Sequence, residues 1–156
     1  MKNKAFTLVE LLVVVLIIGI LAAIAVPQYR LAVEKSRVAQ VISAISSIAQ
    51  AQEVYYMATG HYTDKMSGLD ISVNIPKGWQ YSLYNTTGYH KIEFYNTNLN
   101  YDLQLIRYYN NCGTVCIHPG KTYCWARSSS TLAQKICKSV GQIEGYKDNG
   151  GYRWIL

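Results

Sequence analysis

The sequence has little charge and few residues suited to catalysis. Only 15% of its 156 residues are Asp, Glu, Lys or Arg, and only three are histidines. His61, His90 and His118 lie far apart, and no Ser/His/Asp or Cys/His grouping suggests a catalytic nucleophile. The sequence has no glycine-rich loop that would cradle a phosphate. We therefore expect that the protein is not an enzyme and needs no cofactor. Its hydrophobic content of 50% separately argues that the chain is folded.

The hydrophobic residues are concentrated near the N-terminus. Of the 21 residues from Phe6 to Val26, 18 are hydrophobic. A helix of this length spans a hydrocarbon core of about 30 Å, at about 1.5 Å per residue. Lys2 and Lys4 precede the run, and a short basic flank stays in the cytoplasm. The pattern predicts a membrane anchor followed by an exported C-terminal part, and it disfavours a cytosolic enzyme.

Glu10 is a carboxylate within this apolar run. An ionised carboxylate costs about 2.5–3.5 kcal/mol at the centre of a membrane helix and less near an interface. Its position alone is compatible with two interpretations. The side chain either reaches the cytoplasmic headgroups or is kept for a cationic partner in the membrane.

The first 37 residues contain a specific series of features. A short basic leader is followed by Phe-Thr-Leu-Val-Glu at positions 6–10, the apolar run, and then Pro27 and Tyr29. This series closely resembles the N-terminal signal of type IV pilins and of type II secretion pseudopilins. The resemblance implies that a prepilin peptidase cleaves between Ala5 and Phe6 and methylates the new amino terminus of Phe6. Ala5 stands where the family usually has glycine.

The resemblance also assigns roles within the apolar helix. It implies that Glu10 pairs with the Phe6 amine of a neighbouring subunit in a filament. Such a pair offsets much of the desolvation of two charges in hydrocarbon and fixes the axial register. Gly19 and Pro27 are poor helix formers, so we expect a kink near Pro27. By resemblance, the helix melts between such positions inside a filament.

The hydrophobic pattern beyond the apolar run predicts an α+β fold. From Val38 to Tyr55, apolar residues step mostly by three or four, and Gly60 is a helix stop signal. These features predict one helix from about Phe6 to Ala58, about 80 Å long. Alternation over 79–84, 91–95 and 99–105 predicts three strands of an antiparallel meander that covers the helix.

The whole chain is thus expected to adopt a pilin fold with four segments. These are a leader at 1–5, a hydrophobic helix half at 6–26, an amphipathic helix half at 27–60 and a β-sheet head at 61–156.

The four cysteines all lie in the part expected to be exported: Cys112, Cys116, Cys124 and Cys137. An even number in an oxidising compartment predicts two disulfides, for which three pairings exist. The spacing lacks a C-x2-C pair, so we expect no zinc or other metal site. We favour Cys124–Cys137 with Cys112–Cys116, because Gly113 relaxes the short loop and a short helix over 128–138 leads back past Cys124.

The favoured function is a structural subunit of a type IV pilus, which polymerises for adhesion, twitching motility or DNA uptake. The main alternative is a type II secretion pseudopilin, a family whose major members bind calcium through C-terminal acids. Here the last 45 residues offer only Glu144 and Asp148, which favours the pilus. A signal-anchored periplasmic enzyme or binding protein would leave Glu10 and the processing signal unexplained.

The resemblance implies a set of partners and two locations. The partners are further copies of the subunit, the prepilin peptidase, an inner-membrane assembly platform and minor pilins. The subunit is expected in the inner membrane, with its C-terminal part in the periplasm, and then in an extracellular filament. DNA contact is a weaker prediction, because residues 27–156 carry a net charge of +5 but no dense basic patch.

Overall fold

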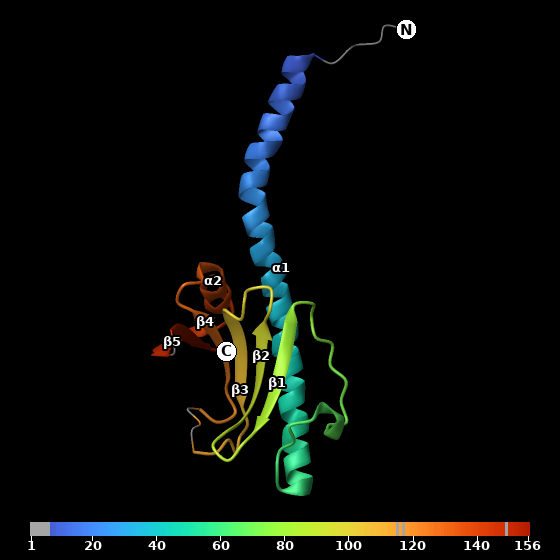
Figure 1. Ribbon diagram of the computed structural model, residues 1–156, viewed down its shortest axis with the longest axis vertical. Helices are drawn as coiled ribbons and strands as arrows, with labels where there is room; N and C mark the ends of the chain where they lie inside the picture. The colour runs from blue at the N-terminus through green and yellow to red at the C-terminus, as the bar shows by residue number, and fades with distance from the viewer. Residues whose placement is uncertain (1–6, 115, 117, 149) are drawn as a thin grey trace. The chain divides into compact units, whose positions relative to one another are not determined.

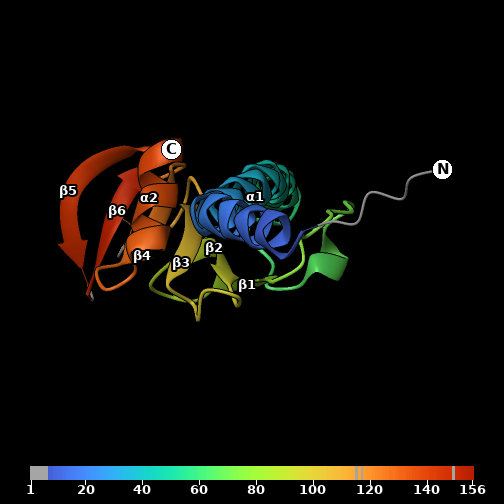
Figure 2. The same ribbon diagram turned by 90° about the horizontal axis from the view of Figure 1, so that it is seen from above.

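The computed structural model describes residues 7–114, 116, 118–148 and 150–156, and for 143–148 it describes the backbone only. The chain divides into two compact units, Met1–Lys35 and Ser36–Leu156, and each is described by itself. The elements are α1 (Leu8–Thr59), η1 (Met66–Gly68), β1 (Trp79–Asn85), β2 (His90–Asn96), β3 (Leu103–Tyr108), β4 (Thr122–Arg127), α2 (Thr131–Val140), β5 (Gln142–Asp148) and β6 (Gly151–Ile155). Figure 1 labels the two α-helices and β1 to β5, and Figure 2 also labels β6.

The helical backbone of α1 is unbroken from Leu8 to Thr59, close to the range expected from the sequence. The helix ends at Gly60, whose φ of 76° is in the left-handed region that glycine adopts without strain. The Gly60 amide donates to the Tyr56 carbonyl at 2.8 Å, which satisfies one carbonyl of the last turn. Pro27 lies inside α1, and the expected kink there stays a prediction.

The strands form one antiparallel sheet in the order β1-β2-β3-β4-β6-β5. The first four strands are sequential neighbours, as the expected meander requires. After β4 the chain forms α2 outside the sheet. It then returns as the edge strand β5, and β6 lies between β4 and β5. The long helix and antiparallel sheet of an α+β pilin-like fold are therefore present, with three strands more than the sequence predicted.

The third predicted strand was placed too early, at residue 99. Residues 97–101 form a turn, and β3 begins at Leu103. Asn100 and Tyr101 have φ values of 49° and 63°, which a strand does not allow. The Asn96 side chain accepts a hydrogen bond from the Leu99 amide at 3.1 Å and helps to hold this turn.

The core on the helix-bearing face of the sheet follows the strand register. Tyr81, Phe94, Leu105, Cys124 and Trp154 are successive partners across five strands, so their side chains share one face. Phe94, Leu105 and Cys124 are fully buried. Figure 2 shows the second half of α1 and the short helix α2 over this face of the sheet.

The second half of α1 supplies the other side of the core. Its buried apolar residues recur at helical spacing, as the sequence predicted. They are Val38, Val41, Ala44, Ile45, Ile48 and Ala49.

Gln52 continues this buried stripe as a polar residue whose side-chain amide both donates and accepts a hydrogen bond. Its Nε2 donates to the Thr63 carbonyl at 2.7 Å, and its Oε1 accepts from the Thr63 amide at 3.1 Å. Gln52 is fully buried, so the pair ties the chain that follows Gly60 back onto α1.

Replacing Gln52 tests this tie. We expect Gln52→Leu to lower the free energy of unfolding by about 1–2 kcal/mol, because both backbone groups of Thr63 lose their partner. The exposed neighbour Gln50 is the control, and Gln50→Leu should change stability by less than about 0.5 kcal/mol. Denaturant unfolding of the full chain in detergent micelles measures both, and equal losses would contradict the proposed tie.

Candidate assembly site

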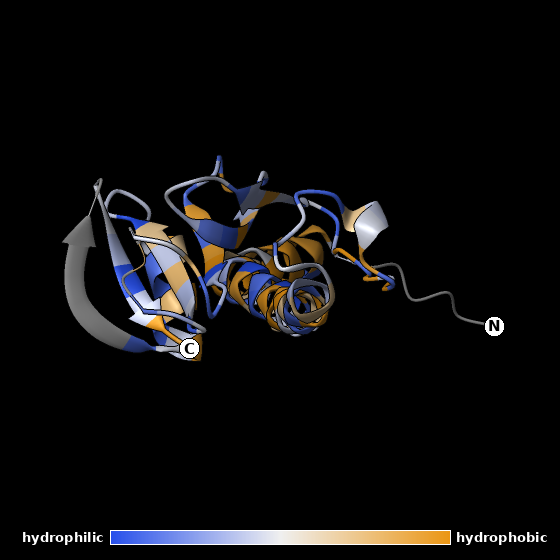
Figure 3. Cartoon of the chain, turned by 90° about the horizontal axis from the view of Figure 1, so that it is seen from below, coloured by the Kyte–Doolittle hydropathy of each residue, from blue (hydrophilic) through white to orange (hydrophobic). Residues whose placement is uncertain are grey.

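The first 19 residues of α1 expose apolar side chains around the whole helix. Every large apolar side chain from Leu8 to Val26 is exposed within the described chain. Figure 3 shows this stretch in orange, whereas later turns of α1 alternate between blue and orange. A helix that is apolar on all sides requires hydrocarbon or other helices around it. By length and composition, α1 is able to cross a membrane.

Glu10 forms a capping box with Thr7 at the start of α1. The Thr7 amide and Oγ1 donate to Glu10 Oε2 at 2.8 and 2.7 Å, and the Glu10 amide donates to Thr7 Oγ1 at 3.2 Å. These bonds satisfy amides that the first helical turn leaves without an intrahelical partner. Both carboxylate bonds end on Oε2, so Oε1 has no hydrogen-bond partner among the described residues.

This arrangement gives Glu10 a second role beside the expected pairing with an amine. Thr7 was not predicted from the sequence, although a Thr followed three residues later by a Glu is the signature of a capping box. Ala5 and Phe6, the expected cleavage and methylation residues, lie outside the described residues. The pairing of Glu10 with Phe6 of a neighbour therefore stays a prediction.

Gly19 and Pro27 both lie within the helical backbone of α1. A Cβ atom added to Gly19 would meet no described atom within 4 Å. Packing within the described chain therefore does not require glycine at this position, and its use as a weak helix former is the remaining physical effect.

The structure contains two disulfides, Cys112–Cys116 and Cys124–Cys137, which is the pairing favoured from the sequence. Cys124 lies in the buried row of β4, and Cys137 is buried on α2. The bond therefore fixes α2 to the sheet. The short Cys112–Cys116 loop depends on Gly113, whose φ is 81° and whose added Cβ would lie 2.8 Å from the Gly88 carbonyl oxygen.

A polar network joins the end of α1 to the loop after β3. The Asn110 amide donates to Glu53 Oε1 at 2.9 Å, and the Tyr62 hydroxyl donates to the same oxygen at 3.1 Å. The Asn111 amide donates in turn to the Tyr62 hydroxyl at 3.1 Å. Burial, helped by the charge of Glu53, raises the pKa of Tyr62 to about 12. Burial also raises the pKa of Tyr109, whose ring packs on that of Tyr62.

The described residues contain no group of three or more His, Cys, Asp or Glu that is placed to hold a metal ion. The side chains of Glu144 and Asp148, the two acids near the C-terminus, lie outside the described part.

The described chain begins with an exposed apolar helix that has a capped carboxylate near its start, and a disulfide-bonded sheet domain follows it in the sequence. The family described as "Prokaryotic N-terminal methylation motif" matches residues 1–26. The chain begins with this methylation motif. The match includes Thr7 and Glu10 and ends at Val26, the last residue of the apolar run.

The curated relatives extend the similarity beyond the methylation motif. A fimbrial protein of Pseudomonas aeruginosa is 50% identical over 51 residues, 33% of each chain. A type IV major fimbrial protein FimA of Dichelobacter nodosus is 52% identical over the same length, again 33% of each. Type II secretion system core protein G of P. aeruginosa is 36% identical over 77 residues, 49% of this chain and 54% of that protein.

These alignments are partial. The chain spans between 33% and 54% of the length of these curated relatives. No solved structure shows significant similarity to the chain. The aligned stretches are longer than the 26 residues of the methylation motif, both for the fimbrial proteins and for the secretion protein.

Thr7→Ala tests the capping box within the methylation motif. The variant loses the hydroxyl that bonds to both the amide and the carboxylate of Glu10, and we expect about 1 kcal/mol less protection of the first turn. Amide hydrogen exchange of the full chain in micelles should then be about fivefold faster at Glu10. Thr7→Ser keeps the hydroxyl and is the matched control; equal exchange in the two variants would contradict the cap.

The raised pKa of Tyr62 predicts a loss of stability in alkali. The folded chain keeps the Tyr62 proton above pH 10.0, the ordinary tyrosine pKa, whereas the unfolded chain releases it. Stability is therefore complete below about pH 10 and falls as the pH rises to about 12. Denaturant unfolding across this range should show a shallower fall in Tyr62→Phe. Tyr101→Phe removes an exposed phenol and should keep the steep fall; identical slopes in the two variants would refute the assignment.

Proposed function

We propose that this chain is a structural subunit of a type IV pilus, cleaved by prepilin peptidase before Phe6, methylated there and polymerised into a surface filament. The observation that carries the proposal is the methylation motif joined to an exposed apolar helix. Such a helix is stable in the inner membrane before assembly and among copies of itself afterwards. The role is structural and contains no catalytic step.

Glu10 is the proposed selection device for assembly. In the free subunit its Oε2 accepts both hydrogen bonds from Thr7, so the carboxylate is partly compensated within its own chain. Its Oε1 is then available for the methylated Phe6 amine of a neighbour. Pairing the two charges makes burial of both less costly and favours one axial register.

The C-terminal region favours the pilus over the secretion pseudopilin. The two disulfides stabilise a domain that an extracellular fibre would expose. The alternative draws support from core protein G, to which the aligned part is longer than to the fimbrial proteins. We propose the periplasm as the site of the C-terminal part before assembly, with an assembly platform, minor pilins and other copies as partners.

Replacing Glu10 tests the assembly role. We expect Glu10→Ala to insert into the membrane but to yield roughly tenfold less sheared surface fibre, or lower, because the Phe6 amine loses its partner. Thr7→Ala is the control, since it loses the cap and keeps the carboxylate; its fibre yield should stay near that of the natural chain. Normal fibre from Glu10→Ala would refute the role.

Mass spectrometry of the sheared subunit tests processing separately. The expected subunit begins at a methylated Phe6. A subunit that retains Met1 would contradict cleavage. A processed subunit that occurs only in periplasmic fractions, with protein secretion lost when the chain is deleted, would instead establish the pseudopilin.

A further inference from the structure

The cations that flank the apolar run are distributed in an unusual way. Two lysines precede the run, and Arg30, Lys35 and Arg37 follow it. Positive residues beside a membrane helix normally stay on the cytoplasmic side, and both lysines lie in the leader whose removal we propose. The flank on the exported side is therefore more basic than the positive-inside rule favours. Its cations call for a role on that side of the membrane.

The Ser36–Leu156 unit has one end at which α1 enters and an opposite end at which α1 stops. The Asn110 amide, which follows β3, donates to Glu53 near the stop of α1, so β3 ends at that opposite end. β4 runs antiparallel to β3 and therefore ends, at Arg127, where α1 enters. Figure 1 shows α2 and the turn between β2 and β3 at this same end. We call residues 97–102 and 127–138 the entry surface.

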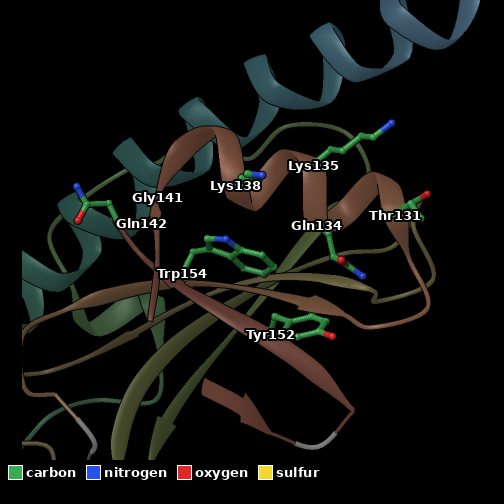
Figure 4. A pocket seen from close by; sticks show the side chains of 8 residues that line it. All are labelled: Thr131, Gln134, Lys135, Lys138, Gly141, Gln142, Tyr152 and Trp154. Atoms are coloured by element: carbon green, nitrogen blue, oxygen red, sulfur yellow. The ribbon is translucent and has the colours of Figure 1, made fainter. Parts of the chain in front are cut away.

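α2 gives the entry surface two exposed cations. The charged residues of this helix are Lys135 and Lys138, which are both exposed and lie three residues apart, on neighbouring positions of one helix face. In Figure 4 the Lys135 side chain extends from α2 away from the sheet. The other face of α2 is buried, and its Cys137 is bonded to Cys124 of the sheet. The two ammonium groups are therefore carried by a fixed helix.

The acid of the entry surface is neutralised by an arginine. Asp102 Oδ1 lies 2.5 Å from Arg127 Nε, and the Arg127 amide donates to the Asp102 carbonyl at 2.9 Å. This pair cancels its own charges. The entry surface therefore keeps the net charge of +2 that its two lysines supply.

The entry surface also exposes an aromatic ring. Tyr101 is 46% exposed, and its ring packs at 5.3 Å from that of Tyr95. Its φ of 63° is costly for a residue other than glycine, and its amide is held by the Asn96 carbonyl at 2.9 Å. Tyrosine combines an apolar ring with a polar hydroxyl and is enriched where a membrane meets water. Cations and an exposed tyrosine together are typical of a surface that contacts lipid headgroups.

The sequence keeps the entry end close to the bilayer. Ser36, the first residue of the unit, follows Val26 by ten residues, or about 15 Å of helix. The headgroup layer occupies about 5–7 Å of this length, and the remaining 8–10 Å or so is close to the Debye length at physiological ionic strength. The charge of anionic headgroups is therefore only partly screened where α1 enters the unit.

We propose that the entry surface docks on anionic phospholipid headgroups of the bilayer that the first half of α1 spans. Lys135 and Lys138 pair with lipid phosphates, and the ring of Tyr101 lies among the headgroups. The proposal rests on the membrane anchor of the proposed function and adds a lipid partner for the C-terminal unit before assembly.

A lipid surface suits these cations better than a nucleic acid does. Each cation near an anionic bilayer strengthens binding about fivefold, and the anchor makes the encounter intramolecular, so a few cations suffice. A nucleic acid is not tethered to the chain, and it would need a longer track of cations than two lysines on one helical turn.

Paramagnetic relaxation of the full chain in lipid nanodiscs tests the docking. One set of discs contains phosphatidylcholine alone, the other also contains phosphatidylglycerol, and both carry the same trace of a gadolinium-chelating lipid. We expect the amide protons of α2 to relax about threefold faster in the anionic discs. The amides of Asn110 and Asn111, at the opposite end of the unit, should relax equally in both. Salt at about 1 M should abolish the difference, because the Debye length falls to about 3 Å.

Matched charge variants assign the docking to the entry surface. Lys135→Gln combined with Lys138→Gln should return the relaxation of α2 in anionic discs to the phosphatidylcholine value. Lys65→Gln combined with Lys121→Gln removes the same charge at the opposite end and should change nothing. Tyr101→Asn, which suits the left-handed backbone, should lower the relaxation about twofold, because the interfacial ring is lost. Near-ultraviolet circular dichroism checks that each variant is folded.

The possible outcomes separate the docking from the membrane anchor. Free amide exchange from Leu12 to Ile20 in both discs would show that the chain is not inserted, and the anchor and the docking would both fall. Protected amides in this stretch, with the same relaxation of α2 in both lipid compositions, would overturn the docking alone. So would equal losses in the two double-lysine variants. Binding of a double-stranded oligonucleotide at about 1 μM in phosphatidylcholine discs, lost in the Lys135→Gln and Lys138→Gln variant, would assign the cations to nucleic acid and would also overturn it.

Discussion

The apolar surface of α1 is of two kinds, and each needs a different environment. From Leu8 to Val26 it surrounds the helix and is exposed, whereas from Val38 to Ala49 it occupies one stripe and is buried. At about 25 cal/mol per Å² of apolar area, leaving the first kind in water is costly, so hydrocarbon or neighbouring helices must cover it. The second kind is covered within the chain by the sheet. The organisation of the rest of the structure follows from this division.

The second half of α1 covers only part of the sheet, and α2 covers a further part of the same face. α2 packs on β4 and β6, where its buried Ile136 and Cys137 continue the core (Figure 2). The Cys124–Cys137 bond closes a loop between residues 13 apart, which stabilises the fold by about 3 kcal/mol in the chain-entropy account.

The hydrophobic period was enough to predict the second half of α1 and β2, because each has one buried face. The same alternation predicted β1, although Trp79 is its only buried residue. β4 was missed because Thr122 to Ala126 are all buried, so both faces are covered and no alternation remains. The start of β3 was wrong because Leu99 and Tyr101 continue the alternation, although the backbone at Tyr101 is left-handed. At the candidate assembly site, Glu10 stood out as a charge in an apolar run. The hydrogen bonds between Glu10 and Thr7 were not predicted, because the uncharged hydroxyl of Thr7 does not stand out in the apolar run as a carboxylate does.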